Sequence, residues 1–260
     1  MKLEDVLSQF QVTQDQLLSL MQLEEGDIAY VSGSVIEGFG NPHSDLDLFV
    51  LKPTIDHVEA QFIYARYRIQ IQIIQNKRFD VEYHRFADLE ALLKLARDFN
   101  VDNLNHMESL DPKTIDFLHR LRIALPLYGE KELRSAQTSI HVENLCASLK
   151  NWRIRSYNAH LMDCTGMLAI GDLDTAVLWA RQTLCDAVDV CLAVHLDTNP
   201  TEKWRSRKIE RNFGKDSELY KDYHRLMWQE VTIENREAYI RQLLSFASDL
   251  ILEAQLKTDR

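Results

Sequence analysis

The chain has 260 residues and a formal net charge of −10, with 45% hydrophobic and 27% charged residues. This composition is typical of a folded, soluble protein with one large or two modest domains. The acidic balance disfavours a general nucleic-acid-binding protein, which would carry a basic surface, and favours small-molecule or protein acceptors.

No apolar run approaches the roughly 18 residues that a membrane-spanning helix needs. The N-terminus is acidic and interrupted, so it predicts no secretory signal. The four cysteines lie in segments with helical spacing and form no Cys-x-x-Cys pair, which predicts buried thiols rather than disulfides or zinc ligands. We therefore expect a cytoplasmic protein without a membrane partner.

Apolar residues recur with helical spacing over residues 3–24, which predicts a helix. A short apolar run over residues 27–32 then predicts a buried strand that ends at Gly33. Gly33 has no Cβ, so the backbone can turn there and approach a ligand closely. Ser34 adds a hydroxyl beside freed backbone N–H groups, and turns of this kind form concave anion sites.

Acidic and apolar residues alternate at the start of the next predicted strand, over residues 45–51. Side chains at i and i+2 point the same way in a strand, so Asp45 and Asp47 share one face while Leu46 and Leu48 enter the core. Neighbouring carboxylates repel each other unless a cation lies between them, and Mg²⁺ binds through carboxylates and substrate phosphates. The stretch predicts a metal and triphosphate site; the alternative is an ordinary turn and a solvated edge strand.

Residues 54–66 are predicted as a helix, and residues 68–75 and 77–84 as two strands with alternating side chains. Asn76-Lys77 lies between these two strands and can turn a hairpin. The hairpin would set the second of them beside the strand that begins at Asp45.

That second strand contains Asp80 and Glu82, which alternate with apolar residues and therefore face the same side. One of the two carboxylates can complete a metal site, and the other can act as the general base toward an acceptor hydroxyl. The alternative is an amphipathic strand with a solvated face.

Residues 33–48 resemble the signature of the nucleotidyltransferase superfamily that includes DNA polymerase β and the aminoglycoside nucleotidyltransferases. That signature is Gly-Ser, a spacer of about ten residues, and a strand that alternates acidic and hydrophobic residues. The resemblance extends over residues 27–84. It implies that Gly33 and Ser34 contact the triphosphate of a bound nucleotide.

The resemblance also implies metal ligands. Asp45 and Asp47 would bind Mg²⁺, with two ions expected, and the family uses a third carboxylate on a neighbouring strand. Asp80 fits that third position best and Glu82 fits it second. We therefore predict Asp45, Asp47, Asp80 and Glu82 as the catalytic carboxylates.

Residues 86–99 and 112–124 are predicted helices, and from residue 130 onward long helical periods dominate. We predict a catalytic domain over residues 1–130 and a bundle of about five helices over residues 131–260, which would form the other wall of the cleft and select the acceptor. The fold class is therefore α+β, with a small mixed-sheet domain followed by an all-α bundle. The predicted bundle helices span about 139–169, 173–196, 199 onward, 216–230 and 233–256.

Five basic residues fall within residues 201–211 of this acidic chain. Lys203 is the first candidate, and Arg205 the second, to neutralise triphosphate charge, as electrostatic clamps do in phosphoryl transfer. Trp204 can stack on an adenine ring. The alternatives are a solvated helix face with i,i+4 ion pairs and a tryptophan buried for its area.

Arg155 and His160 resemble the Arg-x4-His motif of the HEPN ribonucleases, which often accompany small nucleotidyltransferases. Five helical residues rotate by roughly 140°, so the two side chains do not share a face, and we interpret them as surface or buttressing residues. A ribonuclease that uses them is the alternative. His43, near the Asp pair, either contacts substrate or caps its loop.

On the basis of the resemblance, we predict an enzyme that moves a nucleoside monophosphate, AMP from ATP, to a hydroxyl group and releases pyrophosphate. The expected acceptor is a small molecule, for example an aminoglycoside-like antibiotic. The alternatives are a protein-nucleotidylating enzyme, an antitoxin-type regulator, and a nucleotide sensor without turnover.

Overall fold

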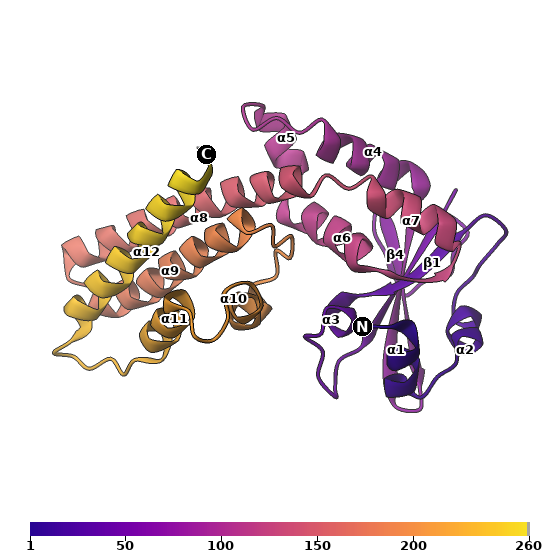
Figure 1. Cartoon of the computed structure of the whole chain (residues 1–260), viewed down its shortest axis with the longest axis horizontal. Coiled ribbons are helices and arrows are strands. Elements are labelled where there is room, and N and C mark those ends of the chain that lie inside the picture. The colour runs from indigo at the N-terminus through magenta and orange to yellow at the C-terminus, as the bar shows by residue number, and fades with distance from the viewer. Residues whose placement is uncertain (259–260) are drawn as a thin grey trace. The chain divides into compact units, whose positions relative to one another are not determined.

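The computed structural model describes residues 1–258 and divides into two compact units (Figure 1). The first comprises Met1–Asp98 and Phe117–His141, and the second comprises Phe99–Asp116 and Val142–Arg260. The predicted boundary at residue 130 falls inside the second segment of the first unit. Within the described part of the chain, every helix is too short or too polar to cross a membrane.

A six-stranded mixed sheet lies at the centre of the first unit, with the strand order β3-β4-β5-β2-β1-β6. β2 and β5 run parallel, and the other neighbouring strands run antiparallel. The predicted strands over residues 27–32 and 45–51 and the predicted hairpin are confirmed. The strands are β1 (Ile28–Ser32), β2 (Leu46–Lys52), β3 (Phe62–Ile63), β4 (Tyr67–Ile74), β5 (Lys77–Arg85) and β6 (Leu125–Tyr128).

One face of the sheet is apolar because side chains alternate along each strand. Leu46 and Leu48 are fully buried on this face, as the alternation predicts. Helices α1 (Leu3–Phe10) and α2 (Gln14–Ser19) cover it. Burying each such leucine stabilises the fold by about 1.5–3 kcal/mol. Other members of this core are Val6, Phe10, Leu17, Val31, Val50, Phe79 and Val81.

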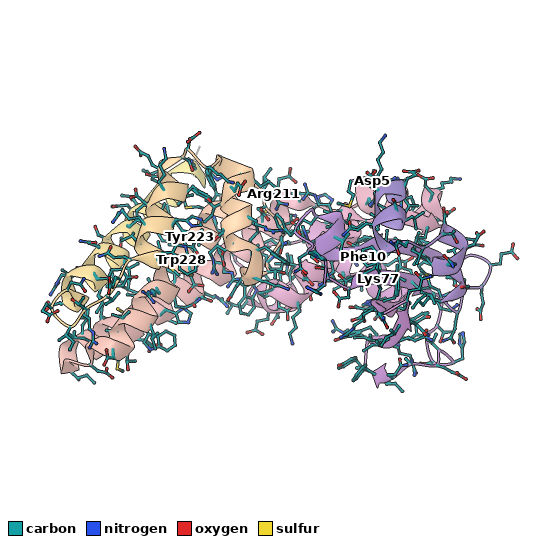
Figure 2. All side chains as sticks on the ribbon, turned by 90° about the horizontal axis from the view of Figure 1, so that it is seen from below. Asp5, Phe10, Lys77, Arg211, Tyr223 and Trp228 are labelled. Atoms are coloured by element: carbon teal, nitrogen blue, oxygen red, sulfur yellow. The ribbon has the colours of Figure 1, made fainter. Side chains whose placement is uncertain are left out.

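Helix α1 also contacts the β4–β5 hairpin. The rings of Phe10 and Phe79 lie 5.9 Å apart, centroid to centroid. Lys77 Nζ lies 5.3 Å from the centroid of the Phe10 ring and donates a 2.8 Å hydrogen bond to the Gln9 carbonyl. Figure 2 shows Lys77 beside Phe10. These contacts hold the N-terminal helix against the strand that contains Asp80.

The predicted single helix over residues 3–24 is wrong, because the chain forms two short helices there. Gln11 adopts a left-handed φ of 56°, which ends α1. Thr13 then starts α2 with a capping box: its hydroxyl accepts from the Gln16 N–H, and the Gln16 side chain accepts from the Thr13 N–H. A strong N-cap of this kind restarts a helix although the apolar spacing continues.

The predicted helix over residues 54–66 is also wrong, because this segment contains turns and the short strand β3. Ile55 and Val58 are buried in the apolar core of the sheet. The Glu59 N–H donates to the side-chain carbonyl of Gln22, 37 positions earlier. Contacts with distant residues determine this segment, and they override its local helical preference.

The hairpin turn lies at Gln75-Asn76, one residue before the predicted position. Both residues have positive φ, 50° and 60°, as a type I′ turn requires.

The edge strand β6 and the following helix α7 (Glu130–Thr138) were not predicted from the sequence. Pro126 is tolerated in β6 because that strand lies at the edge of the sheet, where a missing N–H leaves no neighbour unpaired.

The second unit contains a helical bundle, so the α+β fold class is confirmed. All four cysteines are free and buried, as predicted. The longest helices of the bundle pack side by side, α8 and α12 each against α9. The helices are α8 (Val142–Ile170), α9 (Leu173–Val194), the 3₁₀ turn η1 (Glu202–Trp204), α10 (Arg205–Phe213), α11 (Glu218–Trp228) and α12 (Arg236–Thr258). Before them the chain forms α4 (Phe86–Arg97), α5 (Leu104–Ser109) and α6 (Pro112–Ile123).

Candidate active site

Three polar side chains lie in one row across the sheet, on the face opposite the apolar core. Ser32 pairs with Asp47 on the neighbouring strand, and Asp47 pairs with Asp80 on the next strand. Directly paired residues point to the same face, so Asp47 and Asp80 are neighbours. Asp45 directly precedes β2, and Glu82 follows Asp80 by two positions on the same face. The fold therefore brings the predicted carboxylates together.

Two guanidinium groups contact these carboxylates. Arg78 binds both oxygens of Asp80, at 2.6 Å from Nε and 2.7 Å from Nη2, and its Nε lies 4.0 Å from Asp45. Nη1 of Arg120, from α6, lies 3.2 Å from Oδ2 of Asp47. The carboxylates outnumber the guanidinium groups, so the site retains negative charge that favours a further cation.

Asp47 is largely buried within this cluster, with a side chain that is 18% exposed. Burial, reinforced by the nearby carboxylates of Asp45, Glu82 and Asp80 and opposed by Arg120, raises the pKa of Asp47 from 3.8 to about 7. The positive charge of Arg120 therefore does not offset the effect of burial and of the neighbouring carboxylates on Asp47. Strongly shifted pKa values of this kind concentrate at functional sites.

Gly33 begins the short helix α3 (Gly33–Ile36) directly at the end of β1. Its φ of 82° lies in the left-handed region, and a Cβ at this position would lie 1.8 Å from Oδ2 of Asp47. Only glycine therefore allows the turn to approach Asp47 so closely. The Ser34 carbonyl accepts hydrogen bonds from the N–H groups of Phe39 and Gly40, both at 2.8 Å, which closes the loop after α3.

Aromatic side chains continue the same face of the sheet. The rings of Tyr30 and Phe49 stack with centroids 5.1 Å apart, and the Arg120 guanidinium lies 5.8 Å from the Phe49 centroid. The Tyr30 hydroxyl is buried and has no hydrogen-bond partner among the described residues. Burial and the neighbouring charge of Glu82 raise the pKa of Tyr30 well above 10.0, so this hydroxyl remains a neutral donor.

The acidic face offers oxygen ligands for a metal ion. Over residues 1–258, the structure contains no group of three or more His, Cys, Asp or Glu side chains already arranged to hold a metal ion. The carboxylates of Asp45, Asp47 and Asp80 nevertheless match Mg²⁺ in ligand type and share one face of the sheet. Because Arg78 holds both oxygens of Asp80, an ion there requires Asp80 to exchange this arginine for the metal.

The basic cluster at residues 201–211 lies in the second unit. Arg205 is buried, and its guanidinium binds both oxygens of Asp189 at 2.8 and 2.9 Å. Lys203 is exposed, and its Nζ lies 4.6 Å from the centroid of the Trp204 ring. Arg205 therefore already has a carboxylate partner within its own unit, whereas Lys203 lies at the surface. Their contact with a triphosphate remains a prediction.

Arg155 and His160 form separate contacts within the bundle. His160 Nδ1 lies 2.5 Å from Oδ2 of Asp186, and its ring stacks on Trp179 with centroids 4.9 Å apart. The guanidinium of Arg155 lies 6.0 Å from the centroid of the Trp152 ring. These contacts agree with a buttressing role.

His43 lies in the exposed loop before β2. Its backbone N–H donates to the side-chain oxygen of Asn41 at 2.8 Å, so this part of the loop is held by a local turn. The contact involves only the backbone of His43, so the role of its side chain, as a substrate contact or a loop cap, stays a prediction.

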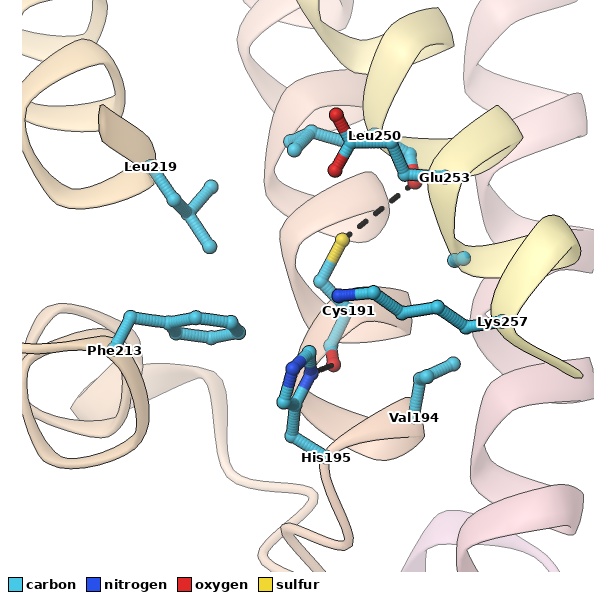
Figure 3. A pocket seen from close by; sticks show the side chains of 9 residues that line it. Cys191, Val194, His195, Phe213, Leu219, Leu250, Glu253 and Lys257 are labelled. Carbon is cyan, nitrogen blue, oxygen red and sulfur yellow. Dashed lines mark hydrogen bonds between the residues drawn. The ribbon is translucent and has the colours of Figure 1, made fainter. Parts of the chain in front are cut away.

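The second unit also contains a cavity of ≈ 160 Å³ beside Cys191 and His195 (Figure 3). The Cys191 thiol lies 3.7 Å from the Leu250 carbonyl, and burial raises the pKa of this thiol to about 12. The thiol therefore stays protonated and is a poor nucleophile at neutral pH. The other lining residues are Val194, Phe213, Leu219, Glu253, Ala254 and Lys257.

Three residues of the acidic face were not predicted from the sequence: Arg78, Arg120 and His84. Arg78 precedes Asp80 by two positions, so strand periodicity alone could have placed it on the same face. His84 follows Glu82 by two positions, so the same periodicity could have placed it on this face as well. Arg120 has no such signal. Arg120 reaches the site from α6, which follows β2 by about 60 positions, and only the packing of that helix on the sheet brings it there.

No protein-family model matches the chain. No curated protein matches it either. Among solved structures, it is similar to a nucleotidyltransferase-like protein from Exiguobacterium sibiricum, with 13% sequence identity and a TM-score of 0.50, over 93% of this chain and 73% of that chain. At this identity the similarity shows the fold alone. The chain therefore has a nucleotidyltransferase-like fold.

Proposed function

We propose that the protein is a metal-dependent nucleotidyltransferase that moves a nucleoside monophosphate, AMP from ATP, to an acceptor hydroxyl. The observation that supports this most directly is the row Ser32–Asp47–Asp80, with Asp45 directly before its central strand. Gly33, which touches the same Asp47, supplies the turn for the triphosphate.

Asp45, Asp47 and Asp80 would hold Mg²⁺. The ions would stabilise the negative charge that develops on the phosphate oxygens during transfer. The protein's own contribution is to fix Asp47 between Gly33 and Arg120. It also limits the access of solvent to Asp47, which strengthens the electrostatic interactions between the carboxylates, the ions and the phosphates. Ser34 would donate to a phosphate oxygen beside Gly33.

Glu82 would act as the general base. It would accept the proton of the acceptor hydroxyl while the acceptor oxygen bonds to the α-phosphorus, and the bond from that phosphorus to the bridging oxygen breaks. Pyrophosphate then leaves with the electron pair of that bond. Glu82 suits this role because its side chain is 24% exposed, and because it lies two positions beyond the metal-binding row.

The acceptor class follows from the acidity of the chain and of the site. We propose a small molecule that bears hydroxyl and cationic groups, such as an aminoglycoside-like compound, in a cytoplasmic setting. A protein hydroxyl is the second acceptor class.

The test is pyrophosphate release with Mg²⁺, each of the common nucleoside triphosphates, and a panel of aminoglycosides and protein acceptors. Asp47→Asn should lower the rate by about 100-fold or more, because the metal supplies several kcal/mol of charge stabilisation. Asp56→Asn, at a side chain that is 83% exposed, is the matched control and should keep the wild-type rate. Equal rates for Asp47→Asn and the wild type would refute the mechanism.

A nucleotide sensor without turnover is the second candidate function. The observation that favours it is the bidentate Arg78–Asp80 pair, which satisfies a carboxylate that a metal would otherwise use. Calorimetry separates the two functions. A sensor binds ATP with Mg²⁺ but releases no pyrophosphate with any acceptor, whereas the enzyme does both.

A further inference from the structure

His84 lies at the edge of the acidic face and makes a contact that the proposed function does not explain. Its Nε2 lies 3.3 Å from Oε2 of Glu82, and its side chain is 11% exposed. A carboxylate can only accept hydrogen bonds, so Nε2 bears the proton in this contact and donates it. The ring thus presents one donor to the proposed general base.

Three aromatic rings surround the His84 ring, each from a different element. Phe117 of α6 lies 4.3 Å away, Tyr67 of β4 lies 5.4 Å away, and Phe49 of β2 lies 6.2 Å away, centroid to centroid. The planes of Tyr67 and Phe49 are within 24° of the His84 plane, so the imidazole is stacked rather than free to turn. This packing fixes the direction of the Nε2–H bond.

We propose that His84 is a positioning residue that holds the Glu82 carboxylate in the orientation needed to take the proton of the acceptor hydroxyl. This inference rests on the proposed function. A glutamate side chain has three rotatable bonds, and ordering it costs side-chain entropy. A donor held on Oε2 orders the carboxylate before the substrate binds, so Oε1 stays available to accept from the acceptor hydroxyl.

The arrangement also separates the roles of the two carboxylates on β5. Asp80 pairs with Asp47 in the metal-binding row and is bound by Arg78. Glu82 pairs with Phe49 and is bound by His84. The geometry therefore assigns metal binding to Asp80 and proton transfer to Glu82, which the sequence pattern alone left open.

The kinetic test compares His84→Phe, which keeps the aromatic packing, with His84→Gln, which keeps a donor. General base catalysis contributes about 10²–10⁴-fold, so Glu82→Gln should lower kcat by that factor, and His84→Phe should lower it about tenfold or more. His84→Gln should restore most of the loss, and the KM for ATP should stay unchanged in all three variants. His84→Phe should have little further effect in the Glu82→Gln background.

His57 provides a matched control. Its Nε2 lies 3.4 Å from Oε1 of Glu24, nearly the same separation, but both side chains are largely exposed, at 49% and 63%. Glu24 lies beside Lys52, at the opposite end of β2 from Asp47. His57→Phe should therefore leave kcat and KM unchanged. A wild-type kcat in His84→Phe would overturn the proposal, as would a loss that His84→Gln fails to restore.

A second measurement separates this inference from the proposed function. Long-range ¹H–¹⁵N spectra of the imidazole in the intact protein should show the Nε2-protonated form of His84, and Glu82→Gln should shift its ¹⁵N signals while the His57 signals stay unchanged. An Nε2 without a proton, or signals that ignore Glu82→Gln, would overturn the proposal even in an active enzyme. If no acceptor supports pyrophosphate release while the spectra match, the proposed function fails and the Glu82–His84 contact stands.

Discussion

Substituting Gly33 by alanine tests whether the turn after β1 and the carboxylate of Asp47 form one structural unit. Gly33 and Gly38 share the same φ of 82°. Alanine therefore introduces the same backbone strain at both positions, about 1–2 kcal/mol. At Gly38 a Cβ would meet nothing within 4 Å, whereas at Gly33 it would lie 1.8 Å from Asp47 Oδ2. Gly38→Ala is therefore a control for strain without the clash.

The clash must displace the Asp47 side chain, because the competing atom belongs to that carboxylate. Displacement costs its contact with Arg120, now at 3.2 Å. Losing a partner in a partly buried ion pair adds about 1–3 kcal/mol to the strain. We expect Gly38→Ala to lower the free energy of unfolding by about 1–2 kcal/mol, and Gly33→Ala to lower it by about 2–5 kcal/mol.

Urea unfolding measures the free energy of unfolding of both variants. Calorimetric titration with Mn²⁺ and ATP measures the affinity of the site for the metal-bound nucleotide. Gly33→Ala should also abolish metal-dependent ATP binding, whereas Gly38→Ala should retain it. Equal destabilisation by the two substitutions, with equal ATP binding, would show that Gly33 does not support Asp47 and would refute this reasoning.

Three further predictions concern the ion pairs and the titration of Asp47. Folding raises the pKa of Asp47 from 3.8 to about 7, so between these pH values the folded state holds a proton that the unfolded chain releases. The stability that this proton contributes is lost as pH rises. The melting temperature of the metal-free protein, measured relative to that of Asp47→Asn, should therefore fall as pH rises from about 4 to 7 and then level off. A flat difference across this range would contradict the shift. Arg78→Ala should tighten Mn²⁺ binding by about 1.4- to fivefold, since a pair with an exposed arginine contributes roughly 0.2–1 kcal/mol. Looser binding in calorimetry would contradict the exchange of Arg78 for metal. Arg205→Met should lower the free energy of unfolding in urea by about 1–3 kcal/mol, because it removes the bidentate partner of buried Asp189 and leaves it the Arg153 contact at 3.4 Å. Lys203→Met, at the surface, should change it by less than about 0.5 kcal/mol.

The elements predicted well are those with strong local signals. The β4–β5 hairpin combines period-two alternation with a short turn, and the bundle helices have long 3.6-residue periods. The segment over residues 54–66 was predicted wrongly because Ile55 and Val58 contact the sheet core rather than one face of a helix. A local pattern contains no information on such partners.

The candidate site shows the same contrast between local sequence signals and contacts with distant residues. The amino-acid sequence was enough to identify the residues that offer the chemistry: a glycine turn, an Asp-x-Asp strand and the pair Asp80 and Glu82. Side-chain alternation is a property of each strand alone, so it needs no knowledge of the neighbouring strands. The direct pairing of Asp47 with Asp80, and the approach of Arg120 to Asp47, are seen only in the folded structure. Strand register and helix packing depend on contacts between residues far apart in the chain, and these form only when the whole sheet assembles.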